Sequence, residues 1–230
     1  MTDQRDELKR TAAEAAVQQV KSGMVVGLGF GSTAIHALRA LGIKLQSGGL
    51  QDVLGVPTAE SIAHAAVDAG IPLTTLEDHP IIDLTIDGAD EVDPQLNLIK
   101  GGGGALLREK IIAQASRRLV IVVDESKLSD RLGSLFKLPV EVLPFGWGSQ
   151  VVFLEELGAN VHMRRQEDGS AYQTDSGNYI LDCDFGAIEN LERLARQLES
   201  RAGIVEHGLF IELADEVIIG LKDGLRTLKR

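Results

Sequence analysis

A cluster of acidic residues follows an apolar segment, residues 81–86, in the middle of this sequence. Asp87 and Asp90 stand three positions apart directly after that segment, so they would lie where a strand ends, at the carboxyl edge of a sheet. A pair of carboxylates at such an edge is as often catalytic as structural. A solvated acidic turn is the alternative. A calcium loop is disfavoured because residues 87–98 lack the spacing and the final glutamate of that motif.

Four consecutive glycines, residues 101–104, separate Lys100 from Glu109. Glycine has the most backbone freedom to lose on ordering, so the close approach of a ligand is the expected reason for such a run. Residues 105–115 have the apolar spacing of a helix, which places Glu109 near the start of that helix. Lys100 and Glu109 would then face one small ligand from opposite ends of the glycine loop. In isolation, residues 108–110 would be interpreted as an exposed charged triplet.

A second glycine loop, residues 27–33, joins an apolar run to another helical pattern. Strand, glycine turn and helix together present backbone N–H groups and the positive end of a helix dipole to a phosphate. Ser32 and Thr33 add hydroxyl donors at the helix start, so a compact phosphate site is favoured over a turn without a ligand. A dinucleotide site is less favoured, because its fingerprint expects an acid after the next strand and Asp52 precedes residues 53–56.

Apolar runs that suit strands alternate with helical patterns through the first half of the chain. This alternation indicates an α/β fold with a doubly wound, mostly parallel sheet. Ligands bind such sheets outside the carboxyl ends of the strands, so the loops after Leu28, Ile86 and Val123 are expected at one edge. The strand runs are residues 24–28, 53–56, 71–75, 81–86 and 119–123, and the helical patterns that follow the first helix include residues 59–69 and 105–115.

The regular alternation of strands and helices changes after residue 137. The new order of strands and helices suggests a compact α+β unit close to the ferredoxin-like, split βαβ arrangement. We therefore expect two domains. Residues 1–132 and 207–230 would form a Rossmann-like catalytic domain, and residues 133–206 a smaller α+β domain that offers a surface for subunit contacts. The runs of the smaller domain are strands at residues 138–143, 160–164, 171–174, 179–183 and 203–206 and helices at residues 150–157 and 188–198.

The composition of the 230-residue chain is that of an ordinary globular protein, with 44% apolar and 25% charged residues. A formal net charge of −11 disfavours binding to nucleic acid or to an anionic membrane surface. The charged N-terminus lacks the apolar core of a secretory signal, and no stretch approaches the roughly 18 apolar residues of a membrane span. The single cysteine, Cys183, excludes an intramolecular disulfide, and no histidines have the spacing of metal ligands. We expect a cytoplasmic protein without a metal site and with Cys183 in its core.

Three stretches together resemble ribose-5-phosphate isomerase of type A: GLGFGSTA at residues 27–34, DGADEVD at residues 87–93 and KGGGGALLREK at residues 100–110. The match continues in order along nearly the whole chain, through VVDESK at residues 122–127 and LPVEVLPFGW at residues 138–147. The resemblance implies an enzyme that interconverts D-ribose 5-phosphate and D-ribulose 5-phosphate in the nonoxidative pentose phosphate pathway. It also implies a homo-oligomer, either a dimer or a tetramer, that uses no metal ion and no organic cofactor.

The same resemblance assigns roles to individual residues. It implies that Glu109 moves a proton between C1 and C2 through an enediol intermediate. Asp87 and Asp90 would hold sugar hydroxyls and assist ring opening, while Lys100 and N–H groups of the glycine loop would meet the developing oxyanion. The substrate-binding residues that it implies are Phe30, Gly31, Ser32, Thr33, Asp87, Gly88, Ala89, Asp90, Lys100, Gly101, Gly102, Gly103 and Lys127.

Phe30 departs from the family pattern, which usually has threonine between the two glycines of this loop. A hydroxyl contact to the substrate is therefore lost, and the ring must either turn away or narrow the pocket. We expect activity to survive, because backbone N–H donors do not depend on the side chain, and substrate affinity to change. Ser32, Thr33 and Lys127 would still anchor the phosphate.

Two rival functions also fit parts of the pattern. A sugar-phosphate sensing domain would keep the fold without catalysis, but the set of Asp87, Asp90, Lys100 and Glu109 is intact and no basic face for DNA is present. A nucleotide-dependent dehydrogenase would instead change the absorbance or fluorescence of its cofactor on titration.

Overall fold

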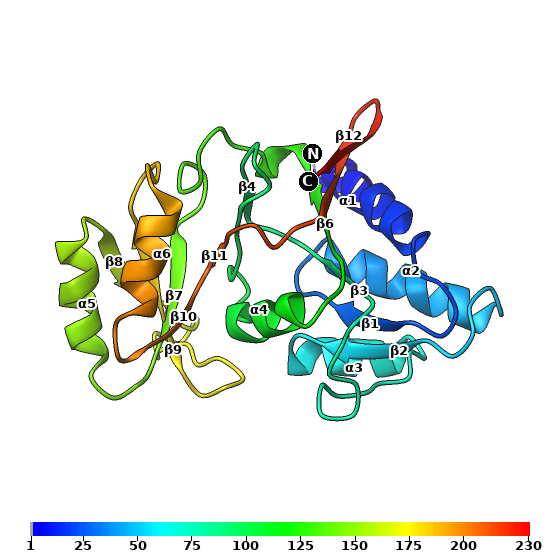
Figure 1. Cartoon of the computed structure of the whole chain (residues 1–230), viewed down its shortest axis with the longest axis horizontal. Helices are drawn as coiled ribbons and strands as arrows, with labels where there is room; N and C mark the ends of the chain where they lie inside the picture. The colour runs from blue at the N-terminus through cyan, green and yellow to red at the C-terminus, as the bar shows by residue number, and fades with distance from the viewer. Residues whose placement is uncertain (1) are drawn as a thin grey trace. The chain divides into compact units, whose positions relative to one another are not determined.

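The computed structural model describes residues 2–230 of the chain, with side chains from residue 5 onward. The chain forms two compact units (Figure 1). Unit 1 contains the described residues up to Ala89 together with Arg108–Lys127 and Glu212–Arg230, and unit 2 contains Asp90–Leu107 and Leu128–Ile211. Among the described residues, none of the helices combines the length and the apolar character that a membrane crossing needs.

Unit 1 is built on a six-stranded sheet with the strand order β13-β12-β6-β3-β1-β2. Neighbouring strands are parallel except at the edge, where β13 pairs antiparallel with β12. This arrangement confirms the expected α/β fold with a mostly parallel sheet. Its strands are β1 (Val25–Leu28), β2 (Leu54–Pro57), β3 (Leu84–Asp87), β6 (Leu119–Asp124), β12 (Glu216–Leu221) and β13 (Gly224–Lys229). Its helices are α1 (Thr2–Val17), α2 (Ala34–Gln46), α3 (Glu60–Asp68), most of α4 (Leu106–Gln114) and the short 3-10 helix η1 (Glu125–Lys127).

The strand β6 is buried along its whole length, because β3 and β12 flank it and α1 packs against it. The helix α1 also lies directly on β12 (Figure 1). A Cβ added at Gly220 of β12 would come within 2.2 Å of the backbone oxygen of Leu8, so only glycine allows this approach. Since β1, β3 and β6 run parallel, the loops that follow them begin at the same edge of the sheet, as expected.

Unit 2 contains a four-stranded antiparallel sheet with the order β10-β7-β9-β8. Its elements are β7 (Leu138–Val142), α5 (Trp147–Glu156), β8 (Asn160–Met163), β9 (Tyr179–Asp184), α6 (Leu191–Glu199) and β10 (Ile204–His207). This chain order and strand order are those of the expected ferredoxin-like, split βαβ arrangement. The core between the sheet and the two helices includes Cys183, which is buried as expected.

A small sheet of three two-residue strands, in the order β11-β5-β4, is the part of unit 2 that the sequence did not indicate. Its strands are β4 (Glu91–Val92), β5 (Leu98–Ile99) and β11 (Leu209–Phe210). Strands this short show no periodicity in a sequence. The buried carboxylate of Glu91 ties this sheet to the following loop, because it accepts the backbone N–H groups of four successive residues: Gly133, Ser134, Leu135 and Phe136.

Two expected strands are wrong. Residues 71–75 form only one isolated bridge, from Leu73 to Gly55, and Pro72 lacks the N–H donor that a longer ladder would need. Residues 171–174 also form only isolated bridges, because Thr174 turns the chain by accepting and donating hydrogen bonds with residues 177 and 178.

The division into domains at residues 132/133 and 206/207 stays a prediction. The observed units differ from it by a few residues at 128–132 and 207–211, which belong to unit 2, and chiefly at Asp90–Leu107, which belongs to unit 2 as well. The physical reason is that this segment carries β4 and β5, and β5 pairs with β11.

Candidate functional site

In unit 1, the carboxylate of Asp87 holds together the two loops that leave β1 and β3. Its Oδ1 atom accepts the backbone N–H of Phe30 at 2.9 Å and that of Gly88 at 2.7 Å. The N–H of Gly29 donates to the backbone oxygen of Ile86 at 3.0 Å. A Cβ added at Gly29 would come within 2.3 Å of Asp87 Oδ1, so the glycine is required for this approach. The structure therefore brings the predicted residues Phe30, Asp87 and Gly88 together.

The same loop leads into the start of α2, where Gly31 has a φ angle of +105° that favours glycine. Thr33 is the N-terminal cap residue of α2, but its side chain makes no capping hydrogen bond. The ammonium of Lys9, from α1, donates to the hydroxyl of Ser32 at 2.9 Å. A cation, a hydroxyl and a helix N-terminus thus lie together, which is an arrangement that suits an anion.

Lys9 is a residue that sequence reasoning missed. On its own helix it is one of several charged residues of a surface face, and nothing in its spacing distinguishes it. Its contact with Ser32 spans 23 positions of the sequence and exists only because α1 packs beside α2.

Glu109 is buried in the first turn of α4, with 3% of its surface exposed. Lys110 is buried as well, so the interpretation of residues 108–110 as an exposed triplet is wrong. Arg108, the third member, pairs with Glu60 of α3 at 4.0 Å. A buried carboxylate at a helix start after a glycine loop is suited to proton transfer, because water is excluded from it. Lys127 lies half-buried in η1, and no hydrogen bond or ion pair among the described residues joins it to the first glycine loop.

In unit 2, the second glycine loop forms a tight turn next to Asp90. The N–H of Gly104 donates to the oxygen of Gly101 at 3.0 Å, and both glycines have positive φ angles, +88° and +105°. The N–H of Gly102 donates to Asp90 Oδ2 at 2.7 Å. Lys100 precedes the turn and is buried, with its ammonium 5.5 Å from the centre of the Phe210 ring. The predicted residues Asp90, Lys100 and Gly101–103 are thus one connected group.

Two further side chains of unit 2 touch the glycine loop. Arg164 donates to the backbone oxygens of Gly101 and Gly102, at 2.8 and 3.1 Å. Tyr172 donates its hydroxyl to the oxygen of Gly103 at 3.3 Å, and burial raises the pKa of this phenol. Sequence reasoning missed both residues, because these contacts span 63 and 69 positions.

The predicted site residues therefore form two groups, each with its own internal geometry. Unit 1 contributes Phe30, Gly31, Ser32, Thr33, Asp87, Gly88, Ala89, Glu109 and Lys127, and unit 2 contributes Asp90, Lys100, Gly101, Gly102 and Gly103. Only the sequence neighbours Ala89 and Asp90, and the short span from Gly103 to Glu109, link the groups along the chain.

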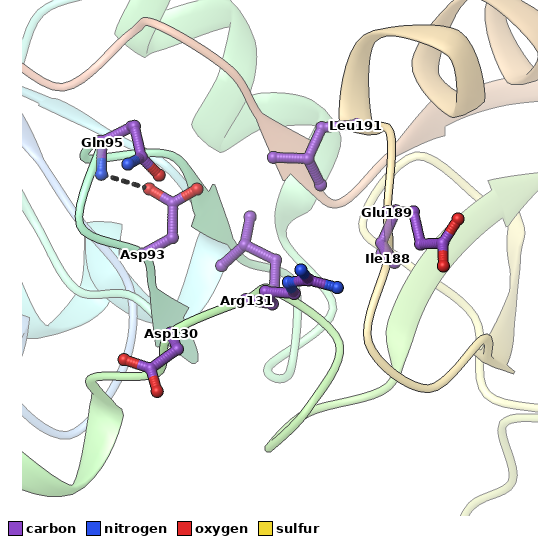
Figure 2. Close-up of a pocket in the computed structure, with 8 residues that line it drawn as sticks. Asp93, Gln95, Asp130, Arg131, Ile188, Glu189 and Leu191 are labelled. Carbon is purple, nitrogen blue, oxygen red and sulfur yellow. Dashed lines mark hydrogen bonds between the residues drawn. The ribbon is translucent and has the colours of Figure 1, made fainter.

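A hollow of about 490 Å³ in unit 2 contains none of these residues (Figure 2). It is lined by Asp93, Gln95, Asp130, Arg131, Leu132, Ile188, Glu189 and Leu191. The carboxylate of Asp93 is already used, because it accepts the N–H groups of Gln95 and Asn97 and the side-chain amide of Asn97. This hollow is therefore a weaker candidate for a polar substrate than the glycine loops. Among the described residues, no group of three or more histidine, cysteine, aspartate or glutamate side chains is arranged to hold a metal ion.

Comparisons of the sequence and of the structure with known proteins indicate the same family. A family model described as ribose 5-phosphate isomerase A (phosphoriboisomerase A) matches residues 54–224. A ribose-5-phosphate isomerase A from Desulfatibacillum aliphaticivorans is 53% identical over 229 residues, which cover 100% of this chain and 99% of the relative. Another from Chloroflexus aurantiacus is 56% identical over 218 residues, which cover 95% of this chain and 91% of the relative.

A solved structure has the same fold. It is a D-ribose-5-phosphate isomerase in complex with phospho-erythronic acid, and it matches with a TM-score of 0.95 at 38% identity. The match covers 97% of this chain and 98% of that one.

Proposed function

The chain belongs to the ribose 5-phosphate isomerase A family, and on that basis we propose how its own residues interconvert D-ribose 5-phosphate and D-ribulose 5-phosphate. The reaction is an aldose–ketose isomerisation of the pentose phosphate pathway. The observation that carries it is the match of the whole chain to this family. The roles of individual residues are supported by the geometry within each unit.

Glu109 is assigned as the base that moves the proton. In the open-chain aldose, its carboxylate takes the proton from C2, and the electron pair of that bond forms the C1–C2 double bond as O1 becomes an oxyanion. A proton passes from O2 to O1, and Glu109 then returns its proton to C1, which leaves the ketone at C2. No atom is gained or lost, so the step needs no oxidant, and we propose that it needs no metal ion.

Lys100 and the glycine loop are assigned to the oxyanion that develops in this step. A buried ammonium and fixed backbone N–H groups stabilise such a charge strongly, because they need not reorganise during the reaction. Asp87 and Asp90 are assigned to the sugar hydroxyls and to ring opening. Both carboxylates also fix backbone N–H groups of the two loops, which supports a positioning role beside the chemical one.

Phosphate binding is assigned to the start of α2. Lys9 and Ser32 are in contact there, and Thr33 is the cap residue beside them. Lys127 stays a proposed further contact, as the family resemblance implies. The N–H of Phe30 donates to Asp87, so the backbone of this position is held whatever its side chain. This supports the expectation that activity survives the phenylalanine.

The test is to mix chelator-treated, nucleotide-free protein with D-ribose 5-phosphate and to follow ketose formation. Wild-type protein should convert it. Glu109→Gln should lower kcat by about 10²–10⁴-fold and leave substrate binding nearly intact, because the amide keeps the shape but cannot take the proton. Glu155→Gln, at an exposed position of α5, is the matched control and should match wild type. Wild-type turnover in the Glu109 variant would remove this residue from the mechanism, and binding without conversion by the wild type would favour a sensing domain.

A homo-oligomer, dimer or tetramer, in the cytoplasm is also proposed, with the contact on the smaller domain. Support comes from apolar side chains that unit 2 exposes along the β7–α5 connection and α5: Leu143, Trp147, Val152 and Phe145, the last with 93% of its surface exposed. Light scattering should show an oligomer that Phe145→Ser weakens and that Leu135→Ser, at an exposed leucine of another loop, leaves intact. A monomeric wild type would contradict the proposal.

A further inference from the structure

We infer that Arg164 and Tyr172 are positioning residues that aim one backbone N–H of the glycine loop at the substrate oxyanion. The inference rests on the proposed function, because it assigns the oxyanion to this loop. It concerns contacts within unit 2 alone.

Three successive carbonyl groups of the glycine loop are held by side chains. Arg164 Nη1 donates to Gly101 O at 2.8 Å and to Gly102 O at 3.1 Å. The hydroxyl of Tyr172 donates to Gly103 O at 3.3 Å. A glycine loop without such bonds would sample many conformations, so these contacts select one of them.

The orientation of the N–H groups follows from the carbonyls. In a trans peptide the C=O and N–H point in opposite directions, so each held carbonyl fixes the N–H of the next residue. The N–H of Gly102 donates a hydrogen bond to Asp90, and the N–H of Gly104 donates one to Gly101 O. The N–H of Gly103 has no acceptor among the described residues, and Gly103 is exposed. It lies in the same peptide as Gly102 O, which Arg164 holds, and is therefore the donor presented to a ligand.

Arg164 is itself fixed, which a positioning residue requires. Its guanidinium forms a two-bonded pair with the carboxylate of Asp182 on β9, and the arginine side chain is 14% exposed. Tyr172 is fixed next to it, because its backbone N–H donates to Arg164 O at 2.9 Å and its ring lies 5.9 Å from the guanidinium. Tyr172 also fills the space where a side chain at position 104 would be, with its hydroxyl 2.2 Å from an added Cβ.

The charge of Arg164 adds to the effect of geometry. A cation that binds a peptide oxygen polarises that peptide and strengthens the hydrogen bond that its N–H donates. Arg164 acts in this way on the peptide that carries the Gly103 N–H. The contribution should appear chiefly in the transition state, where the oxyanion has formed, rather than in substrate binding.

The experiment compares two neighbouring arginines. Arg164→Gln removes the contacts to the glycine loop, while Arg165→Gln removes a contact of the same kind, to Gly169 O at 2.7 Å, outside this loop. We expect Arg164→Gln to lower kcat by about 10²-fold with KM changed less than about threefold, and Arg165→Gln to match wild type. Arg164→Lys should recover part of the loss, because it returns the charge without the two-bonded geometry.

A second measurement separates positioning from general damage. Phospho-erythronic acid has one carbon fewer than the substrate, so with the two phosphates aligned its carboxylate carbon takes the place of C2. One carboxylate oxygen then takes the place of O2 and the other lies at the position of C1, so the acid carries a negative charge where the enediolate does. Its inhibition constant should rise in Arg164→Gln in parallel with the fall in kcat, while KM for ribose 5-phosphate does not. Equal changes in the inhibition constant and in KM would mean that Arg164 has a merely structural role, and would overturn the inference.

Tyr172→Phe keeps the ring and removes only the hydroxyl that donates to Gly103 O, so it tests the inference even if Arg164→Gln fails to fold. We expect kcat to fall several-fold in this variant, by about the effect of one neutral hydrogen bond. A wild type that cannot convert ribose 5-phosphate would defeat the proposed function and this role with it. An active wild type with unchanged kcat in Arg164→Gln and Tyr172→Phe would defeat this role alone.

Discussion

Replacing Glu91 with glutamine should lower the free energy of unfolding of unit 2 by about 3 kcal/mol. The buried carboxylate accepts four backbone N–H groups, at 3.0 Å from Gly133 and Phe136 and at 3.2 Å from Ser134 and Leu135. Oε2 accepts the shorter pair and Oε1 the longer pair. Glutamine has the same shape, but one of its two ends is an NH₂ donor, which must face two N–H donors in either orientation.

The size of the loss depends on which pair of bonds is given up. A hydrogen bond to a charged group contributes about 1.5–3 kcal/mol, so two lost bonds amount to about 3–6 kcal/mol. The amide oxygen should keep the shorter pair, because Ser134 and Leu135 are exposed and their N–H groups can turn to water. The loss then lies near the lower limit, and the midpoint of thermal unfolding of a unit of this size should fall by about 12–24 °C.

Urea unfolding followed by tryptophan fluorescence measures this loss. Trp147 is the only tryptophan of the sequence and lies in α5, so it reports on unit 2. Glu189→Gln removes the same charge from an exposed position of unit 2 and should change stability by less than about 0.5 kcal/mol. A loss below about 1 kcal/mol in Glu91→Gln, or equal losses in the two variants, would refute the reasoning.

Three further outcomes can be checked. Lys9→Met should raise KM for ribose 5-phosphate about tenfold with little change in kcat, because one charge-assisted contact to phosphate is lost in substrate and transition state alike; a fall confined to kcat would contradict this. Gly29→Ala should abolish most isomerase activity, because its Cβ would overlap the carboxylate of Asp87. Near-normal rates in an isomerase assay would contradict this prediction. Burial raises the pKa of the Cys183 thiol. The folded chain therefore holds this proton more tightly than the unfolded chain, and stability should be unaffected below about pH 8.5 and decline above it. Cys183→Ala should flatten that alkaline decline, and the wild-type thiol should react with a thiol reagent only after unfolding.

The fold was largely predictable because the signals that specify it are local. Residues 119–123 form a continuous β-branched run, and the corresponding strand β6 is buried throughout. The order of strands and helices after residue 137 likewise indicated the split βαβ unit. The signal failed where a strand depends on a distant partner rather than on its own residues. Residues 71–75 and 171–174 have strand-like composition but no continuous ladder, and β4 and β5 are too short to show a period.

The candidate site was predictable where its residues stand in motifs. Asp87, Asp90 and the glycine loops are recognisable because glycine runs and acids after strands are unusual in themselves. Lys9, Arg164 and Tyr172 have no such signal. They reach the loops through contacts that span 23, 63 and 69 positions, so their neighbours are set by packing and not by local sequence.

The interrupted layout of unit 1 has a consequence for how the chain is made on the ribosome. In the finished sheet, β12 covers the edge of β6 that β3 does not. All of Leu128–Ile211 is synthesised between these two strands. Throughout that interval the nascent chain exposes the free edge of LVIVVD, an apolar run of the kind that pairs with other chains. The exposed edge of β6 is open to aggregation until a chaperone binds it or β12 is synthesised and pairs with it. Completion of β12 therefore ends the period in which the nascent chain is prone to aggregate through this strand.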